Sequence, residues 1–304
     1  MINVTGVCNL KCRYCYYQPR AFDVMEWKNF QRVIYELYLN KVFMLVMSGG
    51  EPFTHPRICD FLHLAHKKFD HVIILSNGTM LKQKHLVTIE EIIQEKGMFP
   101  IQISIDSIFP HINEITRCDP NPVINNIRIL SERGATIIVS MVITKFNLNS
   151  IRKSIIFLSK YAKIFHLIPF EPALTLREKE LSYKVKEEKL HSFLKSVKGL
   201  EKKRNLIIDT PVEEKKSEGG CASGASCQAA FSVIVIDPNL QVRPCDRLTD
   251  ITIGDLSKSS LKTIWESKAA MDIVNQPISL CAQRACATYS ARNQIEKMID
   301  KLEN

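Results

Sequence analysis

The sequence predicts an α/β protein, a partial (β/α)6 TIM-like barrel followed by a small C-terminal domain with a β-hairpin and helices. Short apolar, β-branched runs alternate with amphipathic stretches up to about residue 170. This alternation is typical of βαβ units in a parallel sheet. The chain of 304 residues, 45% of them hydrophobic, is long enough to bury a sizeable core. Most of its ten cysteines gather near the two ends.

Six apolar runs are the expected strands, and five amphipathic stretches are the expected helices. The strands are predicted at residues 1–6, 42–49, 71–78, 101–106, 136–144 and 164–170, and the helices near 26–40, 57–69, 83–96, 122–133 and 149–161. Right-handed crossovers let such units curl into a barrel, with functional loops at the carboxyl ends of the strands.

Three ranges follow from this pattern. Residues 1–177 form the expected barrel core, 178–212 a bridging helix (about 178–199) and linker, and 213–304 the C-terminal domain. In that domain, residues 231–245 are predicted to form a hairpin that turns at Asp237-Pro238-Asn239. One helix is expected over about 258–274, and a terminal helix after the last two cysteines.

Composition limits the class of protein. No apolar run reaches the roughly 18 residues of a membrane span, and no secretory signal pattern is seen, so we expect a cytoplasmic protein with no membrane contact. Thiols stay reduced there, and ten cysteines then need an explanation other than disulfides. The net charge of +9 is diffuse, and its densest stretch, 184–205, is interspersed with glutamates. Nucleic acid is therefore an unlikely partner.

The front cysteines have metal-ligand spacing. Cys8, Cys12 and Cys15 form CxxxCxxC, and the next histidine is as far away as His55. A zinc knuckle needs a fourth ligand nearby, whereas three thiolates can hold three irons of a cubane cluster and leave the fourth iron open. The pattern favours an iron–sulfur cluster with a vacant coordination position.

With Tyr14 before its third cysteine, this stretch resembles the signature of radical S-adenosylmethionine (SAM) enzymes. The resemblance implies that SAM binds the open iron of a 4Fe–4S cluster. Reductive cleavage of SAM would give a 5′-deoxyadenosyl radical, which takes a hydrogen atom from the substrate. A reductant such as flavodoxin or ferredoxin is then expected.

Three later motifs strengthen the resemblance, each at the end of a predicted strand. The GGEP-like motif is similar to the family's contact for the methionine ammonium of SAM, and the other two lie where relatives contact its carboxylate and ribose. The implied contacts are Ser48, Gly49, Gly50, Glu51 and Pro52 in the first motif, Ser76 and Asn77 in the second, and Ser104 and Asp106 in the third.

Residues 104–130 also resemble the family's segment after strand four. Many relatives have a glycine where this chain has Cys118, after Arg117. A thiol readily donates a hydrogen atom to a carbon radical, so Cys118 is a candidate catalytic residue or substrate contact; a packing role is the alternative. His166, Glu171 and Asp209, near late strand ends, are candidate substrate contacts or structural polar residues.

The back cysteines and the hairpin resemble the SPASM extension of this family, or its shorter twitch form. The implied ligands are Cys221, Cys227, Cys245, Cys281 and Cys286. We expect one auxiliary 4Fe–4S cluster, with Cys281 or Cys286 as its fourth ligand; a second auxiliary cluster or a zinc ion are the alternatives. The glycine usual in this hairpin is replaced, and Asn239 is expected to take the positive φ.

An auxiliary cluster favours net oxidation. The resemblance implies oxidative modification or cross-linking of a ribosomally synthesised peptide, or of a protein side chain. A separate leader-peptide-binding protein is one expected partner. Dehydrogenation or epimerisation of a small molecule, or a peptide modified without a cross-link, are the alternatives. A ferredoxin-like carrier needs neither GGEP nor a barrel, and a nucleic-acid-modifying enzyme would carry an appended RNA-binding domain, which is not evident.

Overall fold

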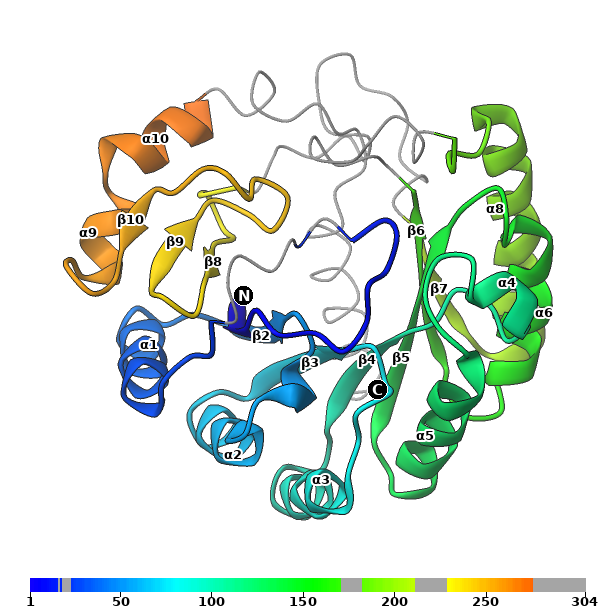
Figure 1. Ribbon diagram of the computed structural model, residues 1–304, viewed down its shortest axis with the longest axis horizontal. Helices are drawn as coiled ribbons and strands as arrows, with labels where there is room; N and C mark the ends of the chain where they lie inside the picture. Colours follow the sequence, from blue (N-terminus) through cyan, green and yellow to red (C-terminus); the bar gives the residue numbers. More distant parts are fainter. Residues whose placement is uncertain (16, 18–22, 171–181, 211–228, 276–304) are drawn as a thin grey trace.

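The computed structural model describes residues 1–15, 17, 23–170, 182–210 and 229–275 (Figure 1). The predicted terminal helix and several candidate site residues lie outside the described residues: Glu171, Cys221, Cys227, Cys281 and Cys286. The predicted division of the chain at residues 177 and 212 also falls in segments that are not described, and it remains a prediction.

Seven parallel strands form a curved sheet in chain order. They are β1 Ile2–Thr5, β2 Met44–Gly49, β3 His71–Ser76, β4 Pro100–Ser104, β5 Thr136–Ile143, β6 Ile164–Pro169 and β7 Ile207–Asp209. The predicted α/β partial barrel is confirmed, and all six predicted strands are present. The seventh, β7, has only three residues and was missed because so short a run carries no periodicity.

Helices cover the outer side of the curved sheet (Figure 1). They are α1 Trp27–Leu39, α2 Ile58–Lys68, α3 Gln83–Lys96, α5 Pro120–Glu132, α6 Leu148–Leu158 and α8 Glu187–Arg204, with the short η1 Pro52–Thr54 and α4 Pro110–Asn113 in loops. The bridging helix was expected from 178 to 199, but it runs from Glu187 to Arg204. Acidic residues in its first turn and basic residues in its last suit the helix dipole at these ends.

The two faces of the sheet bury different side chains. Outward residues such as Leu45, Ile74 and Ile103 join the large apolar core under the helices. On the inner face, a separate small cluster contains Ile73, Ile138 and Ile164, packed with the partly buried Met44, Leu75 and Ile207. This cluster is an apolar floor inside the barrel, and the inner face becomes more polar toward the carboxyl ends of the strands.

The C-terminal hairpin extends the same sheet. It consists of β8 Val235–Ile236 and β9 Gln241–Arg243, followed by β10 Gly254–Asp255; β8 pairs with β1 in parallel. The predicted hairpin is therefore present. The single helix expected over 258–274 is wrong, because two short helices occur, α9 Leu261–Trp265 and α10 Lys268–Asn275. The second helix begins directly after Ser267, whose hydroxyl accepts a hydrogen bond from the N–H of Ala270 at 3.2 Å.

The hairpin turn also differs from expectation. Asn239 does not take the positive φ; Leu240 does, at 69°. The carbonyl of Asp237 accepts from the N–H of Leu240, and the N–H of Asp237 donates to the carbonyl of Gln241, both at 2.9 Å. Leu240 is buried, so contacts of its apolar side chain offset the cost of the left-handed backbone.

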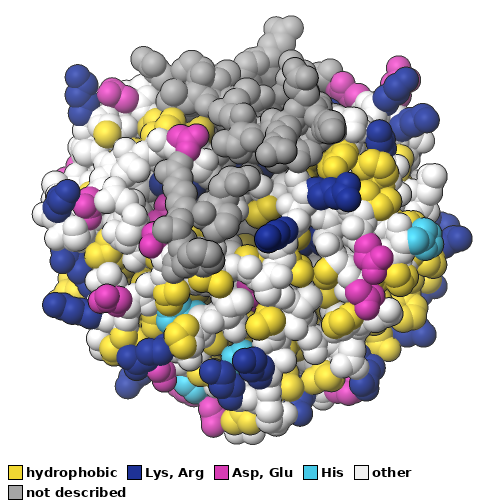
Figure 2. Space-filling model, viewed as in Figure 1, with side chains coloured by type: hydrophobic (Ala, Val, Ile, Leu, Met, Phe, Trp, Pro, Cys, Tyr) yellow, Lys and Arg dark blue, Asp and Glu magenta, His cyan; other side chains and the backbone are white. Residues whose placement is uncertain are grey.

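The surface shows no concentrated charge of one sign in the view of Figure 2. Lys and Arg side chains are spread around this face with Asp and Glu between them. Within the described part of the chain, no helix has the length and apolar character needed to cross a membrane.

A partly buried carboxylate, Asp237, fastens the hairpin to β1. Asp237 accepts hydrogen bonds from Asn3 Nδ2 at 2.8 Å and from Arg243 Nε and Nη2 at 2.7 and 2.9 Å. The Arg243 side chain is only 3% exposed. Since the bond from Asn3 spans 234 positions of sequence, this network links the two ends of the described fold.

Replacing Asp237 with alanine should lower the free energy of unfolding by roughly 3 kcal/mol, because it leaves a buried guanidinium without its carboxylate. The matched control is Asp60→Ala. It removes the ion pair with Arg57, whose side chains are about half exposed, and it should cost less than about 1 kcal/mol. Urea unfolding of both variants measures the difference, and equal losses would contradict the prediction.

A second prediction concerns acid stability. His66 is 5% exposed and stacks on Phe99, and burial lowers its pKa to about 4. The unfolded chain, with a histidine pKa of about 6.5, therefore takes up this proton first. The contribution of neutral His66 to the free energy of unfolding is fully present above about pH 6.5, and it is lost as the pH falls toward about 4.

Between pH 7 and pH 5 the contribution of His66 amounts to about 2 kcal/mol. Urea unfolding at these two pH values should show that His66→Gln loses less stability than the wild type by that amount. Other titrating groups act in both proteins and cancel in the comparison. The same pH dependence in both would contradict the prediction.

Candidate functional site

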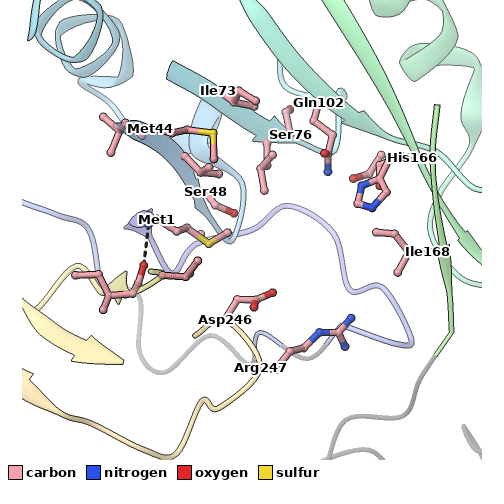
Figure 3. A pocket seen from close by; sticks show the side chains of 18 of the residues that line it. Met1, Met44, Ser48, Ile73, Ser76, Gln102, His166, Ile168, Asp246 and Arg247 are labelled. Carbon is pink, nitrogen blue, oxygen red and sulfur yellow. Dashed lines mark hydrogen bonds between the residues drawn. The ribbon is translucent and has the colours of Figure 1, made fainter. Parts of the chain in front are cut away.

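A cavity of about 1020 Å³ lies on the inner side of the curved sheet. Its walls come from the inner faces of β2 to β6, from the loop after β1 and from the segment after β9. Figure 3 shows His166 and Ile168 on one side of this space, and Asp246 and Arg247 across it. The site is thus enclosed between the barrel and the C-terminal hairpin.

All three front cysteines line the cavity. The loop after β1 folds locally: the N–H of Leu10 donates to Cys8 Sγ at 3.4 Å, and the N–H of Cys15 to the carbonyl of Cys12 at 3.1 Å. Burial raises the pKa of each thiol, that of Cys15 to about 11. The charge of Cys12 raises the pKa of Cys8 further, and the charges of Cys12 and Cys8 raise that of Cys15. The three sulfurs are therefore close enough to influence one another.

The chemistry of these donors fits an iron–sulfur cluster. The set consists of sulfur alone, which suits soft metals and iron–sulfur clusters. Among the described residues, no three Cys, His, Asp or Glu side chains converge closely enough to hold one metal ion. The thiolates of a cluster bind different irons, so they need not converge on one point.

The two glycines at the end of β2, Gly49 and Gly50, pack against the backbone of the loop after β1. The N–H of Gly50 donates to the carbonyl of Thr5, and the N–H of Glu51 to that of Val7, both at 2.8 Å. A Cβ at Gly50 would lie 2.3 Å from the Val7 oxygen, and one at Gly49 would lie 2.2 Å from the Thr5 oxygen. Any side chain here would displace the backbone directly before Cys8. The glycines thus set the position of the cysteine loop, in addition to lining the cavity.

Glu51 joins the ends of two strands. Its fully buried carboxylate accepts from the N–H of Asn77 at 2.6 Å, from Ser76 Oγ at 2.9 Å and from the N–H of Phe53 at 3.1 Å. Burial raises its pKa to about 7, against the opposing effect of these hydrogen bonds. Ser48, Ser76 and Asn77 line the cavity; Glu51 and Pro52 are not among its lining residues.

Asp106 anchors the cysteine loop to the end of β4. It is buried and accepts from Tyr14 Oη at 2.5 Å, from Thr116 Oγ1 at 2.8 Å and from the N–H of Val142 at 3.0 Å. Arg117 pairs with the same carboxylate at 3.2 Å and lies over the ring of Tyr14. Tyr14, between Cys12 and Cys15, is therefore held from two sides.

Arg117 is a site residue that the sequence analysis did not single out. Its side chain is only 11% exposed, and it lines the cavity. Burial raises the pKa of Cys12, and the charge of Arg117 opposes that rise and favours the thiolate. The available signal was its place beside Cys118 in a segment that resembles the family. Cys118 itself is partly buried against the core and is not among the cavity-lining residues, so its proposed catalytic role remains a prediction.

A polar row crosses the inner wall. Ser104, Ser140 and His166 are paired in register on β4, β5 and β6, and all three line the cavity. Asp209 on β7 pairs with His166 in the same row, and its Oδ2 is 3.8 Å from His166 Nε2. Ser140 and the cavity-lining Gln102 were not predicted; both are polar residues within apolar runs that the sequence marks as strands.

Cys245 is the one predicted auxiliary ligand among the described residues. It follows β9 closely, and the next two residues, Asp246 and Arg247, line the cavity. This places one back cysteine beside the wall opposite the barrel strands.

Comparison with known families gives two matches. Residues 2–158 match the Radical SAM superfamily, and residues 227–287 match SPASM, described as an iron–sulfur cluster-binding domain. The first match covers more than half of the chain and contains the three front cysteines and the three later strand-end motifs. The second contains Cys227, Cys245, Cys281 and Cys286.

Relatives are similar over most of this chain. The "Antilisterial bacteriocin subtilosin biosynthesis protein AlbA" of Bacillus subtilis (strain 168) is 25% identical over 275 residues, 87% of this chain and 58% of AlbA. The chain thus spans less than two thirds of that relative. Streptococcus suis SuiB bound to S-adenosylmethionine has a TM-score of 0.73 at 16% identity, over 92% of this chain and 69% of SuiB.

SuiB bound to precursor peptide SuiA has a TM-score of 0.72 at 16% identity, over 92% and 68% of the two chains. Native anSMEcpe with bound AdoMet and Kp18Cys peptide has a TM-score of 0.72 at 17% identity, over 92% and 85%. These structures share the fold. The family match over more than half of the chain, which contains the cysteine loop, shows that this chain belongs to the radical SAM superfamily, and the second match shows that it carries a SPASM iron–sulfur domain.

Proposed function

We propose that this protein is a radical SAM enzyme that oxidatively modifies or cross-links a ribosomally synthesised peptide. The observation that carries the proposal is the opening of three sulfur donors onto one large cavity, beside the ends of β2, β3 and β4. Cys8, Cys12 and Cys15 would hold the 4Fe–4S cluster that binds SAM. When bound together, such a cluster and SAM supply hydrogen-atom abstraction from an unactivated C–H bond.

The residues around the cluster have structural and binding roles. Asp106 and Arg117 fix Tyr14 and with it the loop, while the charge of Arg117 favours the thiolate of Cys12. Ser48, Ser76, Asn77 and Ser104 face the cavity and have polar groups suited to SAM. Glu51, Pro52 and Asp106 would act on SAM through the backbone that they hold in place.

For the C-terminal part, we propose one auxiliary 4Fe–4S cluster ligated by Cys221, Cys227, Cys245 and either Cys281 or Cys286. The SPASM match and the closeness of Cys245 to the cavity wall support it. A cluster beside this wall is suited to accept the electron that remains after hydrogen abstraction and deprotonation, which gives net oxidation of the substrate.

The relatives support a peptide substrate. AlbA is named for subtilosin biosynthesis, SuiB is described with a precursor peptide, and anSMEcpe with a bound peptide. A reductant such as flavodoxin or ferredoxin, a separate leader-peptide-binding protein and a cytoplasmic location belong to the same proposal.

The direct test is anaerobic incubation with SAM, dithionite and a peptide encoded by a short reading frame beside the gene. We expect 5′-deoxyadenosine and a peptide lighter by two hydrogen atoms. In Cys12→Ala, 5′-deoxyadenosine should fall to the protein-free background, because the cluster loses a ligand. Cys59→Ala is the matched control: Cys59 is not a cavity-lining residue, and this variant should keep wild-type levels.

Wild-type levels of 5′-deoxyadenosine in Cys12→Ala would contradict the cluster assignment. Production of 5′-deoxyadenosine with oxidation of a small molecule, and no change in the peptide, would move the function to the alternative substrate class.

Metal analysis tests the auxiliary cluster. Anaerobically purified protein should contain about eight irons and about eight acid-labile sulfides, four of each per cluster. Cys245→Ala should lose about half of both and keep the spectrum of the front cluster, while Cys59→Ala keeps all. About four irons plus one zinc would overturn the auxiliary-cluster proposal, and about twelve irons would indicate a second auxiliary cluster.

A further inference from the structure

His166 is a buried imidazole without a hydrogen-bond partner. It is 2% exposed, and neither Nδ1 nor Nε2 makes a hydrogen bond within the described part of the chain. The carboxylate of Asp209 is 3.8 Å from Nε2, which is beyond hydrogen-bonding distance. Figure 3 shows the ring directed into the cavity. A buried polar group that stays unpaired is costly, so this arrangement indicates a missing ligand.

The position of His166 along β6 separates it from the cysteine loop. Phe170, just beyond the end of β6, contacts the ring of Tyr14 between Cys12 and Cys15, with 6.3 Å between centroids. His166 is four residues earlier, roughly 13 Å along a strand that rises about 3.3 Å per residue. Two residues further back, Ile164 belongs to the apolar floor. His166 therefore lies near the floor of the cavity, well below the cysteines.

The cavity reaches from the cysteine loop to His166. Its volume of about 1020 Å³ lies just above the roughly 300–1,000 Å³ found for pockets that hold one drug-sized ligand. SAM at the cysteine end leaves the deep end for part of the substrate.

The wall at this depth offers uncharged hydrogen-bonding groups. Ser140 pairs in register with His166, and Gln102 and Ser104 line the same wall from β4. Burial lowers the pKa of His166 to about 4, so its imidazole is neutral at pH 7. A neutral imidazole donates through one nitrogen and accepts through the other, which matches an amide, itself both donor and acceptor.

We propose that His166 is a substrate-binding residue, whose neutral imidazole hydrogen-bonds an amide of the peptide segment in the deep end of the cavity and so positions that segment below the cysteine loop. This inference rests on the proposed function. It assigns His166 to the substrate and not to SAM.

Three variants test it, with the same neighbouring peptide as the probe. His166→Leu keeps the volume and removes both hydrogen-bonding nitrogens, and His166→Gln keeps a donor and an acceptor. His191→Leu is the matched control, because it makes the same substitution at an exposed histidine of α8 that does not line the cavity. For each protein, iron content, SAM affinity, 5′-deoxyadenosine formed without peptide, and KM and kcat for peptide modification are measured.

In His166→Leu we expect unchanged iron content, SAM affinity and peptide-free 5′-deoxyadenosine. KM for the peptide should rise about tenfold, the equivalent of one lost hydrogen bond. Less peptide should be modified for each 5′-deoxyadenosine released. His166→Gln should recover most of this loss, and His191→Leu should resemble the wild type.

Three results would overturn the inference. In His166→Leu, an unchanged KM and an unchanged amount of modified peptide for each 5′-deoxyadenosine would show that the peptide does not bind the imidazole. Loss of SAM affinity in His166→Leu alone would assign His166 to the cofactor. Loss of iron in both His166 variants would make the residue structural. A wild-type protein that releases 5′-deoxyadenosine but leaves every peptide unchanged is a different result, since it refutes the proposed function itself.

Discussion

The site depends first on the buried carboxylate of Asp106. It receives the hydroxyls of Tyr14 and Thr116, the guanidinium of Arg117 and a backbone N–H of β5. A buried carboxylate is stable only when its oxygens are hydrogen-bonded or ion-paired, so these groups must stay together. Tyr14 lies within the cysteine loop, and the same set of bonds therefore fixes that loop over the end of β4. The position of the three sulfurs follows from an interaction that involves none of them.

Glu51 also fixes the position of the cysteine loop, from the side of β2 and β3. It ties the end of β2 to the end of β3, while the glycines before it press on the backbone that leads to Cys8. The strand-end motifs thus serve the fold before they serve a ligand. Loops at the carboxyl ends of parallel strands leave many N–H groups unpaired, and buried carboxylates are efficient acceptors for them. Glu51 and Asp106 belong to motifs that resemble cofactor contacts, and they also support the residues that line the cavity.

This explains what could be predicted from the sequence and what could not. Parallel strands are buried on both faces, so their apolar runs were visible, and the spacing of Cys8, Cys12 and Cys15 is local. The break at Ser267 and the positive φ of Leu240 depend on single hydrogen bonds and on burial that no periodicity reveals. Arg117 is a site residue because it contacts Asp106 and Tyr14, and the contact with Tyr14 joins residues that are far apart in the sequence. His166 could be marked as a candidate from its strand position, but the lack of a hydrogen-bond partner for it among the described residues is a property of the folded wall.

Three levels along the inner side of the barrel have different chemistry: sulfur with the paired Arg117 at the cysteine loop, neutral polar groups in the middle, and the apolar cluster of Ile73, Ile138 and Ile164 below them. Carbon radicals react with the hydrogen donors that surround them, so hydroxyl, amide and imidazole groups, which have strong bonds to hydrogen, limit side reactions at the middle level. The thiol of Cys118 is held out of this space against the core, which is consistent with such protection. A single strand, β6, spans the layers: Phe170 touches the cysteine loop through Tyr14, and His166 faces the deep end. A shift of that strand would therefore move the substrate end and the cysteine end together, and the rigid barrel keeps their separation constant.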